Sequence, residues 1–185
     1  MPDRSEDGNR GPRPPMRGNG GRADSGPRVP GSGPGAPIPR KTGGLNLRHL
    51  GNGQFEFIHP RCVEELRPDF EEGIEIWKAG EPEEARDALR FALQGCGDNL
   101  WVHAALGRIA LEAFNDPTLA KGHFGYAYEL AVRAIPGDFH GKLPPQRPAN
   151  RPFYDAVEGL ITCNIALGDQ DFAAGLRAKL NRLGG

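Results

Sequence analysis

Apolar residues recur with helical spacing along most of the chain after residue 66, and short breaks divide this region into segments of helix length. Glycine, proline and asparagine mark the breaks, and these residues end or begin helices. The pattern predicts six helices, over about 68–79, 82–93, 101–113, 118–135, 151–167 and 170–183. Asn99, Asp116 and Asn150 precede three of them and are predicted to cap them.

Two glycines, Gly73 and Gly107, stand 34 residues apart, each in the first helix of a predicted pair. Small and large apolar residues follow each glycine in the same order, with one extra residue between the two halves of the second unit. The first unit continues with Ile76, Gly80, Ala85, Leu89 and Ala92, the second with Ala110, Ala120, Phe124 and Ala127, and a looser third unit has Leu160, Gly168, Ala173 and Leu180. A period near 34 that splits into two helix-length halves is typical of helical-hairpin repeats.

A small residue on the first helix of a hairpin lets the second helix approach closely. We expect Gly73 and Gly107 to do this, opposite Ala85 and Ala120. A single hairpin leaves an apolar face uncovered, so about three hairpins must stack to form a stable domain. The alternative is an ordinary helical bundle in which the glycines are accidental. Two further glycines, at 122 and 125, suggest another close approach on the fourth helix.

This pattern resembles the tetratricopeptide repeat family over about residues 66–183. The resemblance implies an all-α solenoid of about three antiparallel helix pairs, with a concave groove formed by the first helix of each pair. By register, that groove would include Phe70, Ile74, Trp77, Trp101, Arg108 and Tyr154. Aromatic residues flanked by arginine suit an extended or helical peptide. The alternative is that the two tryptophans only fill space between hairpins.

Some members of the family clamp the carboxylate at the end of a peptide with lysine and asparagine side chains. At those groove positions this chain has Phe70, Ile74 and Ala105. The resemblance therefore does not imply a carboxylate clamp here.

Residues 1–44 have a composition unlike the rest of the chain. Twenty of these 44 residues are glycine or proline, which is too many for a packed core, so we expect a disordered tail. The Arg-Gly pairs at Arg10 and Arg17 resemble segments that contact RNA, but denser repeats and aromatic residues are missing. A solubilising or tethering tail is the interpretation we favour, and nucleic acid is not an expected partner.

Residues 45–66 form a transition between the tail and the helical domain at 67–185. Residues 54–58 alternate in polarity, but the nearby sequence indicates no second strand to pair with them. We therefore expect irregular structure anchored by Phe55 and Phe57, followed by a short helix from Pro60 to Leu66.

The connection at 136–150 is too long for a repeat turn, and its four prolines exclude a helix. Loops of this length are usually functional or disordered. We expect an ordered loop that Phe139 and Leu143 hold against the helices, closing one edge of the groove. The basic residues predicted to contact a partner are His140, Lys142, Arg147 and Arg151.

The formal net charge of −1 gives the whole chain no bias towards nucleic acid or anionic membranes. Residues 1–44 contain eight basic and four acidic residues, a net of +4, so the remainder carries −5. No apolar run approaches the roughly 20 residues of a membrane span, and no secretory signal is recognisable.

The three cysteines, Cys62, Cys96 and Cys163, are far apart and form no CxxC pair. We expect free thiols in a reducing compartment and hence a cytoplasmic protein. His59 and Cys62 stand three residues apart, but two ligands do not make a zinc site. No metal or other cofactor is expected.

These observations favour a non-enzymatic interaction module, a scaffold or adaptor that binds a peptide or protein. The first alternative is an enzyme or small-molecule-binding domain around residues 136–151, with side chains converging there from His103, His123, His140, Arg108, Arg147 and Arg151. No nucleophile elbow, phosphate-binding loop or HExxH motif supports an enzyme. A second alternative is RNA association through the tail. The partner's identity and the oligomeric state are not predicted.

Overall fold

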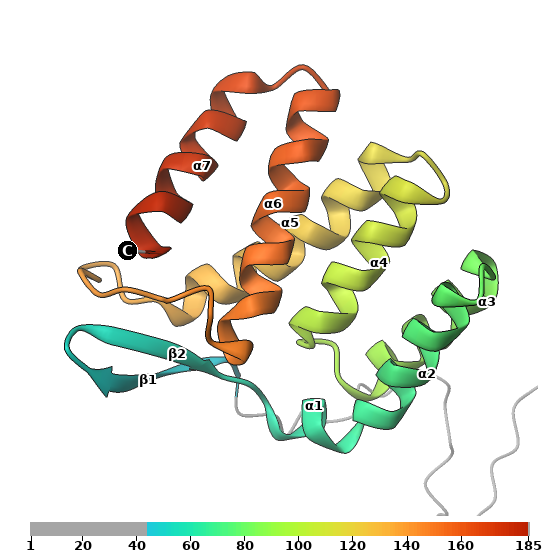
Figure 1. Ribbon diagram of the computed structural model, residues 1–185, viewed down its shortest axis with the longest axis horizontal. Coiled ribbons are helices and arrows are strands. Elements are labelled where there is room, and N and C mark those ends of the chain that lie inside the picture. The colour runs from blue at the N-terminus through green and yellow to red at the C-terminus, as the bar shows by residue number, and fades with distance from the viewer. Residues whose placement is uncertain (1–43, 185) are drawn as a thin grey trace, which may run out of the picture. The chain divides into compact units, whose positions relative to one another are not determined.

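The computed structural model describes residues 44–184 (Figure 1). The expected disorder of the tail concerns residues outside this range, apart from Gly44. The helices are α1 (Arg61–Glu65), α2 (Arg67–Lys78), α3 (Pro82–Gly95), α4 (Leu100–Glu112), α5 (Pro117–Ala134), α6 (Arg151–Ala166) and α7 (Gln170–Gly184), with a short 3₁₀ helix, η1 (Pro148–Asn150), before α6.

The six longer helices pack as consecutive pairs: α2 with α3, α4 with α5, and α6 with α7. Neighbouring pairs also touch, because α4 packs on α3 and α6, and α5 packs on α6. Figure 1 shows the pairs following one another in chain order. The described domain is therefore mostly helical, as predicted.

The helix ends follow from local sequence signals. Oδ1 of Asn99 accepts hydrogen bonds from the backbone N–H groups of Trp101 and Val102, and Asp116 caps α5 in the same way. Prolines occupy the first turns of α2, α3 and α5, where no N–H is needed. Gly80, with a φ of +90°, ends α2 in a conformation that other residues rarely adopt.

Close contact at the repeated glycines is confirmed. A side chain at Gly73 would place its Cβ atom 2.7 Å from Cγ of Leu89, and one at Gly107 would lie 2.7 Å from the ring of Phe124. The same ring also meets Gly159 of α6, where an added Cβ atom would lie 2.4 Å away. Phe124 thus projects from α5 into the space that glycines on α4 and α6 leave open.

The prediction of a close approach at Gly122 and Gly125 is wrong. A Cβ atom at either position would have no neighbour within 4 Å outside its own helix. These residues lie on α5 beside Phe124, but they face open space, so no packing contact explains the glycines.

The prediction of irregular structure before α1 is also wrong. Strand β1 (Asn46–Gly51) pairs antiparallel with β2 (Gln54–Ile58), so a hairpin precedes the helices. The turn is Gly51-Asn52-Gly53, and all three residues have positive φ angles, which glycine and asparagine tolerate best. As predicted, Phe57 anchors this segment: it is buried in the core.

The loop from 136 to 147 is ordered by docking, although not only on helices. The N–H of Leu143, a fully buried residue, donates to the Leu183 carbonyl near the end of α7 over 2.7 Å. Lys142 exchanges backbone hydrogen bonds of 2.8 Å with β2 and its turn, through the N–H of Phe55 and the carbonyl of Gly53. Phe139 packs edge-on against Phe55 and also against the core.

Two of the three cysteines are not free thiols. A disulfide joins Cys62 in α1 to Cys96, the residue after α3, whose Cα atoms are 5.5 Å apart. Cys163 is free and buried. Disulfides persist mainly in oxidising compartments. The cytoplasmic location was predicted from three free thiols, so it loses this support and stays a prediction. Within residues 44–184, no helix has the length and apolar character needed to cross a bilayer.

Candidate functional site

An open cavity of about 520 Å³ lies where α2, the start of α4 and η1 meet, and we call it the α2–α4 cavity. Several of its lining residues were predicted to contact a partner. The lining consists of Val63, Arg67, Phe70, Glu71, Asn99, Trp101, Pro148, Ala149 and Arg151.

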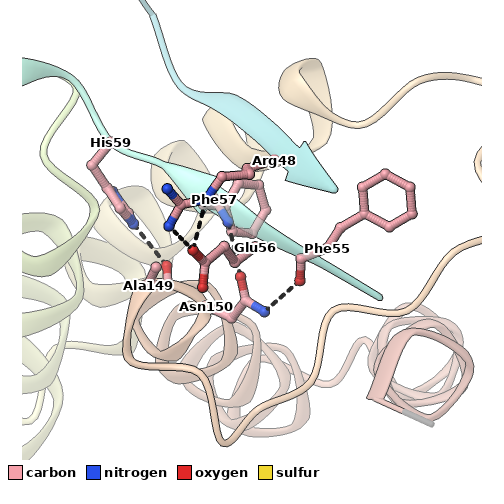
Figure 2. A network of polar contacts seen from close by, with 7 residues as sticks. All are labelled: Arg48, Phe55, Glu56, Phe57, His59, Ala149 and Asn150. Carbon is pink, nitrogen blue, oxygen red and sulfur yellow. Dashed lines mark hydrogen bonds and ion pairs between the residues drawn. The ribbon is translucent and has the colours of Figure 1, made fainter. Parts of the chain in front are cut away.

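The indole of Trp101 is held in place from behind by His59. The two ring centroids are 4.1 Å apart. Nε2–H of His59 donates to the Ala149 carbonyl over 2.7 Å (Figure 2). Burial lowers the pKa of His59, and the hydrogen bond to Ala149 opposes this only in part. The neutral imidazole of His59, just after β2, therefore contacts both η1, through Ala149, and α4, through Trp101.

Asn150 fixes η1 against the hairpin (Figure 2). Its Oδ1 accepts from the N–H of Phe57 over 3.0 Å, and its Nδ2 donates to the carbonyls of Phe55 and Pro144 over 3.1 and 3.0 Å. The prediction that this side chain caps the following helix is wrong, because all its hydrogen bonds go to the strand and the loop. Within the hairpin, Arg48 of β1 forms an ion pair with Glu56 of β2 (Figure 2).

Asn99 is the buried polar residue of the cavity lining and is only 1% exposed. Its Oδ1 is turned towards the first N–H groups of α4, which fixes the amide orientation. None of the side-chain hydrogen bonds between described residues uses its Nδ2 group, so this group can serve as a donor to an occupant.

Arginines border the cavity on two sides. Arg67 pairs with Glu64 over 2.5 Å on the α1–α2 side. On the other side, Nε of Arg151 lies 2.9 Å from Oδ1 of Asp155, which is also 3.9 Å from the guanidinium of Arg108. Both Arg108 and Arg151 were predicted to contact a partner, and they share this carboxylate. All these arginines are exposed, so their guanidinium groups are accessible from solvent.

The predicted groove residues are divided by the structure. Phe70 and Trp101 line the α2–α4 cavity, together with Arg151, which was predicted as a loop contact. Ile74 and Trp77 pack partly buried against the core between α2, α3 and α4, and the exposed Arg108 is not part of the lining. The assignment of Tyr154 to the groove is wrong. Its ring is buried, its hydroxyl donates to the Leu143 carbonyl over 2.7 Å, and burial raises its pKa to about 12.

The predicted loop contacts are also divided. His140 and Arg147 are exposed. Nζ of Lys142 donates to the Arg182 carbonyl over 2.8 Å, so this side chain binds the last turn of α7. The loop does close one edge of the cavity, but through Pro148 and Ala149.

Histidines and arginines do not converge around residues 136–151. His103 and His123 contact each other, with 3.4 Å between their Nδ1 atoms, while His140 lies on the loop and Arg108 meets Arg151 at Asp155. The first alternative site is therefore not assembled. Among residues 44–184, no three or more His, Cys, Asp or Glu side chains are grouped to hold a metal ion.

Comparisons with protein-family models, with curated proteins and with solved structures found no match for this chain. The resemblance to tetratricopeptide repeats therefore rests on the sequence pattern alone.

Sequence reasoning missed some of the lining residues. Asn99 was recognised as a helix cap, and its second role depends on what lies across the cavity. Val63 reaches the site on α1, which the unexpected disulfide ties to the end of α3. Arg67 stands at the start of α2, beside Pro68, but no sequence pattern indicates that this arginine belongs to a site.

Proposed function

We propose that this domain is a non-enzymatic interaction module that binds a segment of a partner protein in the α2–α4 cavity. The observation that carries the proposal is a cavity with two half-buried aromatic residues, Phe70 and Trp101, a buried amide and two arginines at its edge. Aromatic and arginine side chains contribute most strongly to binding at protein interfaces.

We further propose that the three helix pairs form a tetratricopeptide-like array. Two features support this proposal. The pairs contact one another in chain order. In addition, glycines 34 residues apart, Gly73 and Gly107, make equivalent contacts with large apolar residues of the second helices. In such an array α2, α4 and α6 would form one face, and the cavity lies beside the first two of these helices.

The lining defines the chemistry of the occupant. A bulky apolar side chain fits between Phe70 and Trp101, because these rings are held partly exposed. The Nδ2 group of Asn99 can donate to a backbone carbonyl of the occupant. An acidic side chain beside the apolar one would pair with Arg67 or Arg151. We therefore expect short segments in which a large apolar residue is adjacent to Asp or Glu.

The test is selection of binding peptides from a random library with the full chain, followed by affinity measurement on the enriched sequences. Replacing Trp101 by Ala should cost about 2 kcal/mol of binding free energy. Arg151→Gln should weaken binding less, and the difference should shrink at high salt because this arginine is exposed.

Phe91 supplies the matched control, since it is an aromatic residue of α3 that is 62% exposed and outside the cavity. Phe91→Ala should leave peptide affinity unchanged. Equal losses for Phe91→Ala and Trp101→Ala, or enriched peptides without the apolar–acidic pattern, would contradict the proposal.

A further inference from the structure

A second cavity, of about 210 Å³, lies between α3, α4 and α5, and we call it the α3–α5 cavity. Its lining contains two arginines and a histidine but no acidic residue, although residues 45–185 carry a net negative charge. The lining residues are Arg86, Arg90, Leu106, Ala110, Phe114, Leu119 and His123.

The two arginines stand four residues apart on α3, so they lie on the same face of the helix. The guanidinium of Arg86 lies over the ring of Phe114, 5.5 Å from its centroid, and Nε of Arg86 contacts Asp87 over 3.0 Å. No carboxylate of another described residue forms an ion pair with Arg90. This arrangement leaves at least one guanidinium available to an anion.

Hydrogen bonds define which nitrogen of His123 can accept a proton. Nε2 of His103 contacts the Gly97 carbonyl over 3.0 Å, and since a carbonyl only accepts, this nitrogen carries the hydrogen. Nδ1 of neutral His103 is then an acceptor, so Nδ1 of His123, 3.4 Å away, must donate to it. Nε2 of His123 therefore has a free lone pair, on the side of the ring away from His103. His123 belongs to the cavity lining, whereas His103 does not.

Burial favours the neutral forms that this assignment requires. Desolvation lowers the pKa of His103, against smaller opposing effects of the Gly97 hydrogen bond and of Asp98. Desolvation also lowers the pKa of His123, to about 4, with smaller contributions from His103 and Arg90.

We infer that the α3–α5 cavity binds a phosphate group that carries a proton, either as inorganic phosphate or at the end of a small phosphomonoester. Arg90 and Arg86 bind the charged oxygens, and the P–OH group donates to Nε2 of His123. Arginine suits this role because its planar fork matches phosphate oxygens. A carboxylate or sulfate ion offers charge to the arginines but no hydrogen to the imidazole.

The apolar residues distinguish the two sources of phosphate. Leu106, Phe114 and Leu119 line the same cavity and would contact the organic part of an ester. Tighter binding of phenyl phosphate than of inorganic phosphate would identify an ester site. Equal or weaker binding of the ester would identify a site for the free ion.

The experiment is NMR titration of the full chain at pH 6, following the imidazole resonances of His123. The probes are inorganic phosphate, phenyl phosphate and sulfate. At this pH both phosphates retain a proton in a large fraction of molecules, whereas sulfate has none and more charge. We expect phosphate to bind at least about tenfold more tightly than sulfate, as the loss of a hydrogen bond to a charged group implies. Phosphate should also shift the imidazole resonances of His123, because its P–OH group donates to Nε2.

Arg90→Gln should weaken phosphate binding at least about tenfold. Arg133→Gln is the matched control, since Arg133 is an exposed arginine of α5 that pairs with Glu129 outside the cavity. Both residues are exposed, so neither change should unfold the protein, which the melting temperature checks. Equal affinity for sulfate and phosphate, equal effects of the two variants, or no shift of the His123 resonances would overturn the proposal.

Discussion

Two apolar clusters stabilise the described domain, and they differ in size and in the bonds that surround them. The N-terminal cluster joins α2, α3 and α4, and three of its seven buried residues are alanines. These residues are Ala85, Leu89, Ala92, Val102, Ala105, Leu106 and Ile109. The C-terminal cluster extends from the hairpin through the loop to α7 and includes larger side chains such as Phe57, Phe124, Leu143 and Phe153.

The difference shows two ways to fix helix pairs. Alanine buries little apolar area, so the N-terminal cluster gains less hydrophobic free energy, and the Cys62–Cys96 disulfide connects α1 to the end of α3 beside it. The C-terminal cluster has no disulfide and instead brings distant segments together through buried hydrogen bonds, centred on Asn150 and Leu143. One region is stabilised covalently and the other by its hydrogen bonds and larger core.

Loss of the disulfide should have the largest effect on the N-terminal cluster. The bond closes a loop between residues 34 apart, which corresponds to about 3–4 kcal/mol of stability at 25 °C. Denaturant titration with and without a dithiol reductant measures this loss. The double variant Cys62→Ala, Cys96→Ala should be insensitive to the reductant. In the reduced protein, hydrogen exchange should rise first in α2 and α3. An unchanged wild-type denaturation midpoint on reduction would show that the disulfide does not stabilise the N-terminal cluster.

Asn150→Ala tests the C-terminal cluster in the same assay. It leaves the N–H of Phe57 and the carbonyls of Phe55 and Pro144 without their partner, at a cost of about 3 kcal/mol. The exposed Asn181 of α7 is the control, and its change to Ala should stay within about 0.5 kcal/mol. Similar results for the two variants would mean that hydrogen bonds do not hold this region.

Local signals allowed the helices to be predicted, because their causes lie within a few residues of each end. Pro82 and Asn99 act through the first turn that follows them, and Gly73 acts through a partner in the next helix. The hairpin was missed although Gly51-Asn52-Gly53 lies between two short runs that can pair. Such a Gly/Asn turn between two strand-like runs is a local signal for a hairpin, so this element can be predicted from the sequence.

Other features could not be derived from one sequence. Asn150 bonds to a residue 93 positions away, and its choice between capping a helix and binding a strand depends on that strand. The pairing of Cys62 with Cys96 depends on where α1 lies. The groove assignment of Tyr154 failed for a similar reason: helical spacing places Tyr154 and Trp101 on comparable faces, but the docked loop binds the hydroxyl of Tyr154.

Enlarging the contact glycines should affect both clusters. Gly73→Leu would disturb Leu89 in the N-terminal cluster, and Gly107→Leu would displace Phe124 in the C-terminal one, each at about 1–3 kcal/mol. We expect Gly107→Leu to be worse, because Phe124 is also confined by Gly159 and cannot move towards α6. Denaturant midpoints measure both changes. Neutral variants would show that the helices separate easily.

Acidification should destabilise the boundary between the clusters, where His103 and His123 meet. The folded pKa of His123 is about 4, below the ordinary 6.5, so the unfolded chain binds the proton first. The stability that comes from the neutral pair is therefore full above pH 6.5 and is lost as the pH falls towards 4. Because the side chain is only half-buried, we expect a loss of about 1–2 kcal/mol.

Denaturant titrations at pH 7 and pH 4.5 measure this effect. His123→Gln should reduce the loss, whereas His140→Gln, on the exposed part of the loop, should not. Carboxylates contribute equally in all three proteins, so the difference between variants isolates the imidazole. The same loss in wild type and His123→Gln would exclude His123 as its source.

The smallest expected effect is a gain in stability at the glycines that make no contact. Gly122 lies within α5, and a Cβ atom there meets nothing within 4 Å. Gly122→Ala should stabilise the protein by about 0.5–1 kcal/mol, since alanine loses less backbone entropy in a helix. Gly107→Ala, in the neighbouring helix, should destabilise it, because the added methyl would meet the Phe124 ring at 2.7 Å. The melting temperatures of the two variants measure the effect of the same Gly-to-Ala change at an open position and at a packed one. A gain at both positions would mean that Phe124 moves freely between α4 and α6, and the distinction between contact and open glycines would then fail.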